Sequence, residues 1–474
     1  MRLCLCLRRL RLRLRRRRAL IMPASKTAAL QPGIYKFDIS DQNQKSRLHL
    51  RVNPDLSGFL VINAAKMIWL NQSALAMTYL YLNQVSRDEA LKSLRDTFRI
   101  DKKSLADDYD VIVTTLKALL DEKSGACPIC DLGLAVDMPF SSNLEAPYRM
   151  DLALTYRCNL DCAHCYNARP RNYPELSTDE WKKVIDRLWA AAIPHVVFTG
   201  GEPTLREDLP ELIAYAEKTG MVTGLNTNGT RLADRALLDR LIEAGLDHVQ
   251  ITLESHDPRI HESMVRREGA WTQTVEGLRN VVNSKLYMMT NTTLLSNNSA
   301  LLGATLDFLA AEKVPTVGLN ALIYSGKGAQ VATGLREEDL PALLELAIAK
   351  TTQNHQHLIW YTPTQYCHFD PMMLDLGIKG CTAAYYNMCV EPDGKVIPCQ
   401  SYYEPVGSIL TDRWESIWNH PLCLRLRNRE TAPDECRYCD YFQECGGGCP
   451  LARDHQKPNP IYRDLIIRGG DYEK

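Results

Sequence analysis

From about residue 148, apolar segments typical of buried strands alternate with longer segments of helical periodicity. Such an alternation predicts βα units whose strands form a parallel sheet. We predict strands at 150–156, 195–200, 222–228, 248–254, 286–294 and 316–323, and helices near 177–193, 207–219, 233–245, 270–284, 298–313 and 336–353. Six units make three quarters of a (β/α)8 barrel, so the sequence indicates an α/β fold with a partial (β/α)6 TIM barrel over residues 148–353. Chemistry in such barrels takes place at the C-terminal ends of the strands.

A smaller unit precedes the barrel at residues 33–122. Strand-like alternation occurs at 47–52 and 59–63, a third apolar segment stands at 68–71, and three helical patterns follow. Ser86 and Glu89 have the spacing of a capping box, which marks the start of a helix. Small strands followed by three helices predict a winged-helix-like module, joined to the barrel by a linker at 123–147.

The composition excludes a membrane-spanning or fibrous protein. Of the 474 residues, 45% are hydrophobic and 24% are charged, which is ordinary globular usage. No apolar run approaches the roughly 20 residues that span a bilayer.

Residues 1–32 form an Arg-rich leader, with nine arginines and no acidic residue before Met22. The leader lacks the apolar core of a secretory signal. We interpret it as a mis-assigned start codon, which Met22 follows closely. A disordered basic arm for nucleic acid or anionic lipid is the alternative. For the acidic remainder we expect no nucleic-acid partner.

The sixteen cysteines are unevenly distributed. Cys127 and Cys130 form an isolated pair in the linker, which we interpret as structural thiols, with a ligand site as the alternative. A tight triplet follows at 158–165, and nine more lie between residues 367 and 449. In a long chain without a secretory signal, close thiol clusters indicate metal ligands in a reducing, cytoplasmic compartment.

Residues 354–455 have many thiols and few apolar runs, so we predict that metal rather than packing organises them. The segment 390–399 predicts a β-hairpin that turns at Asp393 and Gly394. Cys367 and Cys423 are interpreted as buried apolar residues. Residues 456–474 form a tail.

Cys158, Cys162 and Cys165 directly follow the first barrel strand, in the segment RCNLDCAHC. Three thiolates at this spacing suit three irons of a [4Fe–4S] cluster and leave the fourth iron open for another ligand. A zinc site is the alternative. At this point the sequence resembles the radical S-adenosylmethionine (radical SAM) superfamily. The resemblance implies that S-adenosylmethionine (SAM) chelates the open iron and is cleaved reductively to a 5′-deoxyadenosyl radical, which takes hydrogen from a substrate.

A second signature of the superfamily ends the second strand. The resemblance implies that the segment GGEP contacts SAM, and further contacts are implied at the ends of the third and fourth strands. For the residues at the third and fourth strands, a strand-end or turn role is the alternative. The implied cofactor-binding residues are Gly200, Gly201, Glu202, Pro203, Asn226, Asn228, Glu254 and Ser255.

The C-terminal cysteines resemble the SPASM extension of radical SAM enzymes, which holds one or two auxiliary [4Fe–4S] clusters. The resemblance assigns Cys381, Cys399 and Cys449 to the first cluster, with Cys389 placed as its fourth ligand. It assigns Cys436, Cys439 and Cys445 to the second. A zinc ribbon is the alternative for the CxxC portion.

Two features depart from the family pattern. The family usually has one more cysteine downstream, but no cysteine follows Cys449. The second cluster therefore has either a non-cysteine fourth ligand or one open iron. Asp454 and His455 are the nearest candidates for a non-cysteine ligand. Gln400 stands where the sulfatase-maturating branch carries an Asp that takes a proton from the substrate. Because Gln accepts no proton at neutral pH, that reaction is disfavoured.

Residues 33–122 resemble the RiPP recognition element, the small peptide-chaperone module of pyrroloquinoline quinone biosynthesis. Such a module binds a precursor's leader as an added edge strand, which we expect near residues 47–63. A generic winged-helix fold is the alternative.

Together these resemblances predict a radical SAM oxidoreductase that matures a ribosomal precursor peptide. A reductase, flavodoxin or ferredoxin would supply the electron. One alternative keeps the radical chemistry but acts on a tetrapyrrole, as in heme or heme d1 biosynthesis. Another is a non-catalytic iron–sulfur carrier.

Overall fold

The computed structural model describes residues 30–41, 44–62, 66–98, 101–120, 144–453 and 455. The chain divides into two compact units, residues 1–142 and 143–474, and each is described by itself. In the described part of the chain, no helix has the length and apolar character needed to cross a membrane. The Arg-rich leader, the pair Cys127 and Cys130, and Asp454 lie outside the described residues.

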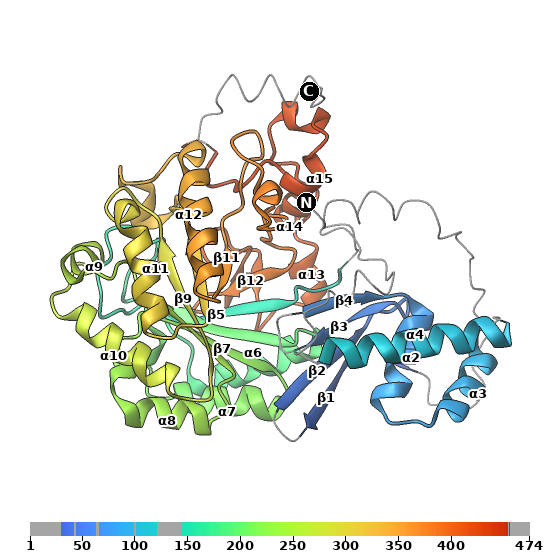
Figure 1. Ribbon diagram of the computed structural model, residues 1–474. Coiled ribbons are helices and arrows are strands. Elements are labelled where there is room, and N and C mark those ends of the chain that lie inside the picture. The colour runs from blue at the N-terminus through green and yellow to red at the C-terminus, as the bar shows by residue number, and fades with distance from the viewer. Residues whose placement is uncertain are drawn as a thin grey trace. The chain divides into compact units, whose positions relative to one another are not determined.

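The first unit is an antiparallel sheet followed by three helices (Figure 1). Its strands, in spatial order, are β1 (Gly33–Asp41), β2 (Gln44–Val52), β3 (Gly58–Ile62) and β4 (Lys66–Leu70). Its helices are α2 (Gln72–Leu82), α3 (Arg87–Thr97) and α4 (Lys102–Leu120). The expected strands and helices are present, and β1 is an additional strand. The winged-helix arrangement stays a prediction.

The sheet order corrects the expected position of the peptide strand. β2 pairs with β1 on one side and β3 on the other, and β3 pairs with β2 and β4. Both strands of the 47–63 region therefore have partners on each side. The prediction that a peptide adds at 47–63 is wrong, because only β1 and β4 lie at edges of this sheet.

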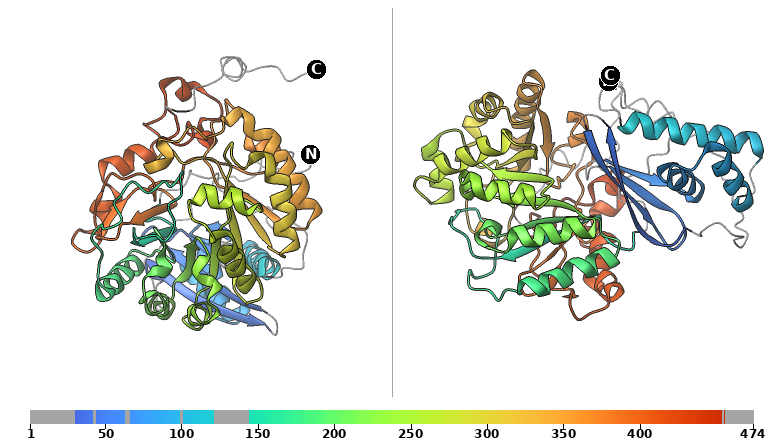
Figure 2. Two further views of the ribbon diagram at one scale, coloured as in Figure 1. Left: turned by 90° about the vertical axis from the view of Figure 1, so that its left-hand side faces the viewer. Right: turned by 90° about the horizontal axis from the view of Figure 1, so that it is seen from below.

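The second unit contains seven parallel strands that follow each other in chain order (Figures 1 and 2). They are β5 (Arg149–Thr155), β6 (His195–Gly200), β7 (Val222–Thr227), β8 (His248–Thr252), β9 (Tyr287–Thr293), β10 (Thr316–Asn320) and β11 (His357–Trp360). The first six are the predicted strands, and β11 extends the partial barrel by one. Buried apolar side chains are frequent in these strands. In β5, for example, four of the six residues after Arg149 are buried and apolar: Met150, Leu152, Ala153 and Leu154.

Helices follow the strands of the barrel and cover its outer side (Figure 2). The six predicted helices are α6 (Thr178–Ala190), α7 (Leu209–Thr219), α8 (Arg235–Glu243), α10 (Ala270–Val282), α11 (Leu302–Ala311) and α12 (Leu340–Gln353). An additional short helix, α9 (Pro258–Val265), is capped by Asp257, whose side chain accepts hydrogen bonds from the backbone N–H groups of Arg259 and Ile260.

The C-terminal extension continues the barrel sheet. β12 (Asn387–Val390) pairs in parallel with β5, and β13 (Lys395–Ile397) and β14 (Gly407–Ser408) add antiparallel strands. The predicted hairpin is confirmed, with Gly394 at φ +86° in its turn. The short helices α13 (Trp414–Trp418), α14 (Pro421–Arg427) and α15 (Phe442–Cys445) follow.

Packing organises much of this extension. Met388, Val390, Ile417 and Leu426 belong to the same buried apolar core as the barrel strands. The prediction that metal rather than packing organises residues 354–455 is therefore wrong for the part up to α14. Beyond α14, the buried apolar residues are few.

Candidate active site

The cysteine triplet lies on a loop that leaves the C-terminal end of β5. The loop is held against the end of α9, because Asp161 N donates to Val265 O (3.1 Å) and Ala163 N donates to Met264 O (2.9 Å). Cys158 and Cys162 pack against Leu160 and Val265. The structure therefore places the three cysteines at the end of the barrel where the sequence predicted chemistry.

The three thiols are half-buried, and all three have a raised pKa. Burial raises the pKa of the Cys158 thiol to about 11, and the charges of Glu202 and Cys165 add to this shift. Burial also raises the pKa of Cys162 well above its usual value, with Cys165, Glu254 and Cys158 contributing. Leu160 N donates to Cys158 Sγ at 3.4 Å. Soft thiolates that receive N–H donors, as here, suit an iron–sulfur cluster.

The two glycines of GGEP are required by a close backbone approach. A Cβ on Gly200 would lie 2.1 Å from Thr155 O, and its φ is +137°. A Cβ on Gly201 would lie 2.3 Å from Arg157 O. Gly201 N donates to Thr155 O (2.7 Å), so the end of β6 lies directly on the segment that enters the cysteine loop.

Glu202 is completely buried and joins the ends of two strands. Its Oε1 accepts from Thr204 N (3.1 Å), Thr204 Oγ1 (2.5 Å) and Thr227 Oγ1 (2.7 Å), and its Oε2 accepts from Asn228 N (2.9 Å). Burial raises the pKa of the Glu202 carboxyl, and these hydrogen bonds oppose the shift. Pro203 opens the short 3-10 turn that follows.

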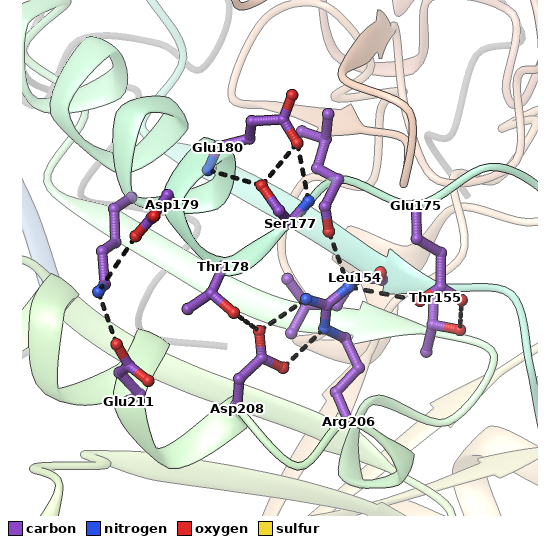
Figure 3. A network of polar contacts seen from close by, with 12 residues as sticks. Leu154, Thr155, Glu175, Ser177, Thr178, Asp179, Glu180, Arg206, Asp208 and Glu211 are labelled. Atoms are coloured by element: carbon purple, nitrogen blue, oxygen red, sulfur yellow. Dashed lines mark hydrogen bonds and ion pairs between the residues drawn. The ribbon is translucent and has the colours of Figure 1, made fainter.

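A polar network supports the loop that follows GGEP (Figure 3). Arg206 forms an ion pair with Asp208 (2.6 Å) and donates to Leu154 O (3.3 Å) and Glu175 Oε2 (3.4 Å). Glu175 also accepts a hydrogen bond from Thr155 Oγ1. The network ties the loop after β6 to the end of β5.

The residues at the end of β7 differ in their relation to the triplet. Asn228 Nδ2 donates to Asn159 Oδ1 (2.8 Å) and lies 4.0 Å from Cys158 Sγ. Asn226 is half-buried within β7, opposite Gln250 of β8. Asn228 therefore contacts the cysteine loop directly, whereas Asn226 lies earlier in the strand.

Glu254 is buried and pairs with His164, which stands between two of the triplet cysteines. His164 Nε2 lies 2.9 Å from Glu254 Oε1, and Glu254 Oε2 accepts from Thr293 N (2.9 Å). Burial lowers the pKa of His164, but the Glu254 carboxylate outweighs this effect and the net pKa is raised. The sequence analysis missed His164, although its position inside the triplet was a signal. Ser255 Oγ accepts from Asp257 N (3.1 Å), which is a turn contact.

Gln400 belongs to a hydrogen-bonded chain inside the barrel unit. Tyr166 Oη donates to Gln400 Oε1 (2.6 Å), and Gln400 Nε2 donates to Asp151 Oδ2 (2.7 Å). Asp151 is fully buried on β5 and pairs with Arg149 (3.0 Å). Sequence reasoning missed Tyr166 and Asp151, which connect the cysteine loop to the extension.

The extension's cysteines fall into neighbouring sets. Burial raises the pKa of Cys381 to about 11, and the charge of Cys399 adds to this increase. Burial raises the pKa of Cys399 to about 12, and the charge of Cys449 adds to it. Burial raises the pKa of Cys449 to about 12, and Cys381 adds to that shift. Cys389 is buried, and Cys399 is among the charges that raise its pKa after burial itself. The pKa of each of these four thiols, which the sequence predicts as one ligand set, is raised by the charge of another member of the set.

The second predicted set lies on the segment from η8 (Asp434–Tyr438) to α15. Cys439 N donates to Cys436 O (3.1 Å), and burial raises the pKa of Cys445 to about 11, with a contribution from Cys436. None of the twelve cysteines in the described residues forms a disulfide. No three His, Cys, Asp or Glu side chains of these residues are grouped closely enough to hold a single metal ion.

Comparison with known proteins identifies the class. Residues 152–309 match the radical SAM superfamily, and residues 381–440 match the iron-sulfur cluster-binding SPASM domain. The chain is 35% identical over 327 residues to the Fe-coproporphyrin III synthase of Methanosarcina barkeri, covering 62% of this chain and 81% of that protein. This chain therefore belongs to the radical SAM superfamily and carries a SPASM domain.

Two further similarities are to a curated relative and to a solved structure. The PqqA peptide cyclase of Granulibacter bethesdensis is 28% identical over 324 residues, covering 65% of this chain and 83% of that protein. Streptococcus suis SuiB, solved with its precursor peptide SuiA, has the same fold at a TM-score of 0.64 and 14% identity, covering 88% of this chain and 98% of that one. The protein is an enzyme that uses a [4Fe–4S] cluster and SAM, and it has auxiliary iron–sulfur binding in the SPASM domain. The alternative of a non-catalytic carrier is set aside.

Proposed function

We propose that this enzyme matures a ribosomal precursor peptide whose leader binds to residues 33–122. Relatives named PqqA peptide cyclase and mycofactocin maturase, the latter from Mycolicibacterium smegmatis, support this substrate class. The observation that carries the proposal is the separate N-terminal unit. The fold likeness to peptide-bound SuiB covers 88% of the chain, which is more than residues 143–474 provide, so it includes part of that unit.

The edge strand β4 is the better position for the leader. Helix α2 directly follows β4 and packs against it. An added peptide strand binds through main-chain hydrogen bonds, and neighbouring elements such as this helix can contact its alternate side chains.

Hydrogen exchange distinguishes the two edges. Adding the leader peptide should slow exchange of the β4 backbone amides and leave those of β1 unchanged. Slower exchange confined to β1 would contradict the assignment to β4, and no slowing in residues 33–122 would contradict leader binding by this unit.

In the barrel, we propose that Cys158, Cys162 and Cys165 hold the catalytic cluster. When bound, the cluster and SAM supply a 5′-deoxyadenosyl radical that removes a hydrogen atom from the substrate. Leu160 N donates to Cys158 Sγ and stabilises its negative charge, and Asn228 Nδ2 lies 4.0 Å from the same sulfur. Gln400 is held by Tyr166 and Asp151 and provides no base for a substrate proton.

The auxiliary clusters are proposed to accept an electron from the substrate radical or to relay one. A flavodoxin, ferredoxin or reductase in the cytoplasm would reduce the catalytic cluster. The domain boundaries proposed from the sequence place this relay in residues 354–455.

A tetrapyrrole substrate is the second candidate. It is favoured by the 35% identity to a protein named Fe-coproporphyrin III synthase. A single experiment separates the candidates. The reconstituted enzyme is incubated with dithionite, SAM and either the peptide encoded by a short neighbouring reading frame or an iron tetrapyrrole. Mass spectrometry should show a mass change in the peptide only. A changed tetrapyrrole with an unchanged peptide would overturn the proposal.

A further inference from the structure

The loop after β11 lies directly against the second set of auxiliary cysteines. Tyr366 N donates to Cys445 Sγ at 3.4 Å, and the Cys445 thiol donates to Thr364 O at 3.6 Å. The ring of Tyr366 lies 6.1 Å from that of Tyr441. Cys367, the residue that follows Tyr366, is therefore adjacent to the segment that carries Cys436, Cys439 and Cys445, although about 70 residues separate them in sequence.

Cys367 does not behave as the buried apolar residue expected from the sequence. It is half-buried. Burial raises the pKa of the Cys367 thiol to about 12, and the charges of Cys445 and Cys436 raise it further. By contrast, Cys423 lies fully buried in the apolar core on α14, and none of the charges that shift its pKa comes from a cysteine.

The loop that carries Cys367 is fixed from behind by a buried carboxylate. Glu337, which is 3% exposed, accepts from Gln365 N (3.2 Å) and pairs with His368 Nδ1 (2.5 Å). These contacts lie on either side of Cys367. They hold its backbone in place without involving its thiol.

A polar donor beside the loop is buried without an acceptor. Gln365 is 8% exposed, yet its Nε2 has no hydrogen-bond partner in the described part of the chain. The side chain of Gln365 lies against Gly448, which stands between Cys445 and Cys449 in the sequence. The sulfur atoms of an iron–sulfur cluster accept such N–H hydrogen bonds.

We propose that Cys367 is the fourth ligand of the second auxiliary [4Fe–4S] cluster, together with Cys436, Cys439 and Cys445. This inference rests on the proposed assignment of those three cysteines to one cluster. Cys367 replaces His455 as the candidate fourth ligand. The ring of His455 stacks on that of Tyr324, with 4.4 Å between the ring centroids. The first cluster keeps Cys381, Cys389, Cys399 and Cys449, so each auxiliary cluster has four thiolates. Neither has an iron open to substrate, which assigns both to electron transfer.

The test uses the full chain reconstituted without oxygen, and its readouts do not depend on activity. Iron is counted and the EPR spectrum of the dithionite-reduced protein is recorded for the wild type, Cys367→Ala, His455→Ala and the matched control Cys423→Ala. We expect about 12 irons per chain in the wild type, His455→Ala and Cys423→Ala, from three four-iron clusters. For Cys367→Ala we expect a loss of about one to four irons and a changed signal from one cluster.

Iron content and spectrum unchanged in Cys367→Ala would overturn the proposal, as would loss of the cluster in His455→Ala. A wild type with only about 8 irons would also overturn it, while leaving the peptide-maturase function untouched. If Cys367→Ala fails to fold, alkylation of the wild type decides the matter. Cys367 should resist iodoacetamide in the cluster-loaded protein and react once the clusters are removed by chelation. Equal labelling in both states would refute its role as a ligand.

Discussion

Replacing Glu202 by Gln tests whether this carboxylate holds the ends of β6 and β7 together. Glu202 accepts four hydrogen bonds, of which those from Thr204 N and Asn228 N come from fixed backbone donors on different oxygens. A Gln side chain has a single acceptor oxygen. Whichever way it turns, its NH2 group faces one of the two backbone N–H groups and leaves that donor buried without an acceptor.

The magnitude follows from these contacts. Losing a hydrogen bond to a charged group lowers the free energy of unfolding by about 1.5–3 kcal/mol. The neutral amide of Gln offsets part of this loss, because burying an amide costs less than burying a carboxylate. We expect a net loss of about 2 kcal/mol, which lowers the melting temperature of the unit at residues 143–474 by roughly 3 °C. Thermal unfolding followed by circular dichroism measures it. The control is Glu207→Gln, because Glu207 is exposed and next to the same loop.

Two measurements on the same variant separate a structural role from cofactor contact. If Glu202 acts by holding the strand ends, Glu202→Gln should lower the stability of the protein without SAM. The production of 5′-deoxyadenosine should fall with it. An unchanged melting temperature with SAM cleavage lost would refute the structural reasoning and restore direct contact with the cofactor.

Three further substitutions test other contacts. Cys158→Ala should abolish 5′-deoxyadenosine production and remove about four irons per chain; retained cleavage would exclude Cys158 as a ligand. Arg169→Gln should lower the free energy of unfolding in urea by about 3 kcal/mol, because Arg169 pairs at 2.6 Å with the fully buried Glu391. The double variant Arg169→Met with Glu391→Leu should regain most of this stability, because it leaves no buried charge unpaired. Gly200→Ala should cost more than about 3 kcal/mol through its clash and positive φ, whereas Gly303→Ala, whose Cβ would meet nothing closer than 3.7 Å, should be neutral or slightly stabilising. Equal effects of the two alanines would contradict the close approach at Gly200.

The barrel strands and helices could be predicted because their apolar periodicity is strong and each is long. Among the missed elements, two have signals in the sequence. Tyr35, Phe37 and Ile39 alternate with polar residues along β1, and Asp257 with the following proline marks the start of α9. The β1 segment has polar residues at alternate positions and α9 has only 8 residues, so their patterns were weak beside those of the barrel.

The candidate site could be predicted only where its residues are close in sequence. The triplet and GGEP each occupy a few consecutive positions. The pairing of His164 with Glu254 depends on how the cysteine loop folds over β8, and the approach of Tyr366 to Cys445 depends on loop packing after β11. Such contacts are set by tertiary structure, which no local spacing encodes.

The pairing of β12 with β5 limits how the gene for this enzyme can be divided. β5 is the first strand of the barrel, and its outer edge is covered only by a strand that the chain supplies more than 230 residues later. A premature stop between α12 and β12 would leave an apolar strand edge unpaired, which favours aggregation. Recombination that exchanges C-terminal extensions between relatives must therefore supply a strand that pairs with β5 as β12 does.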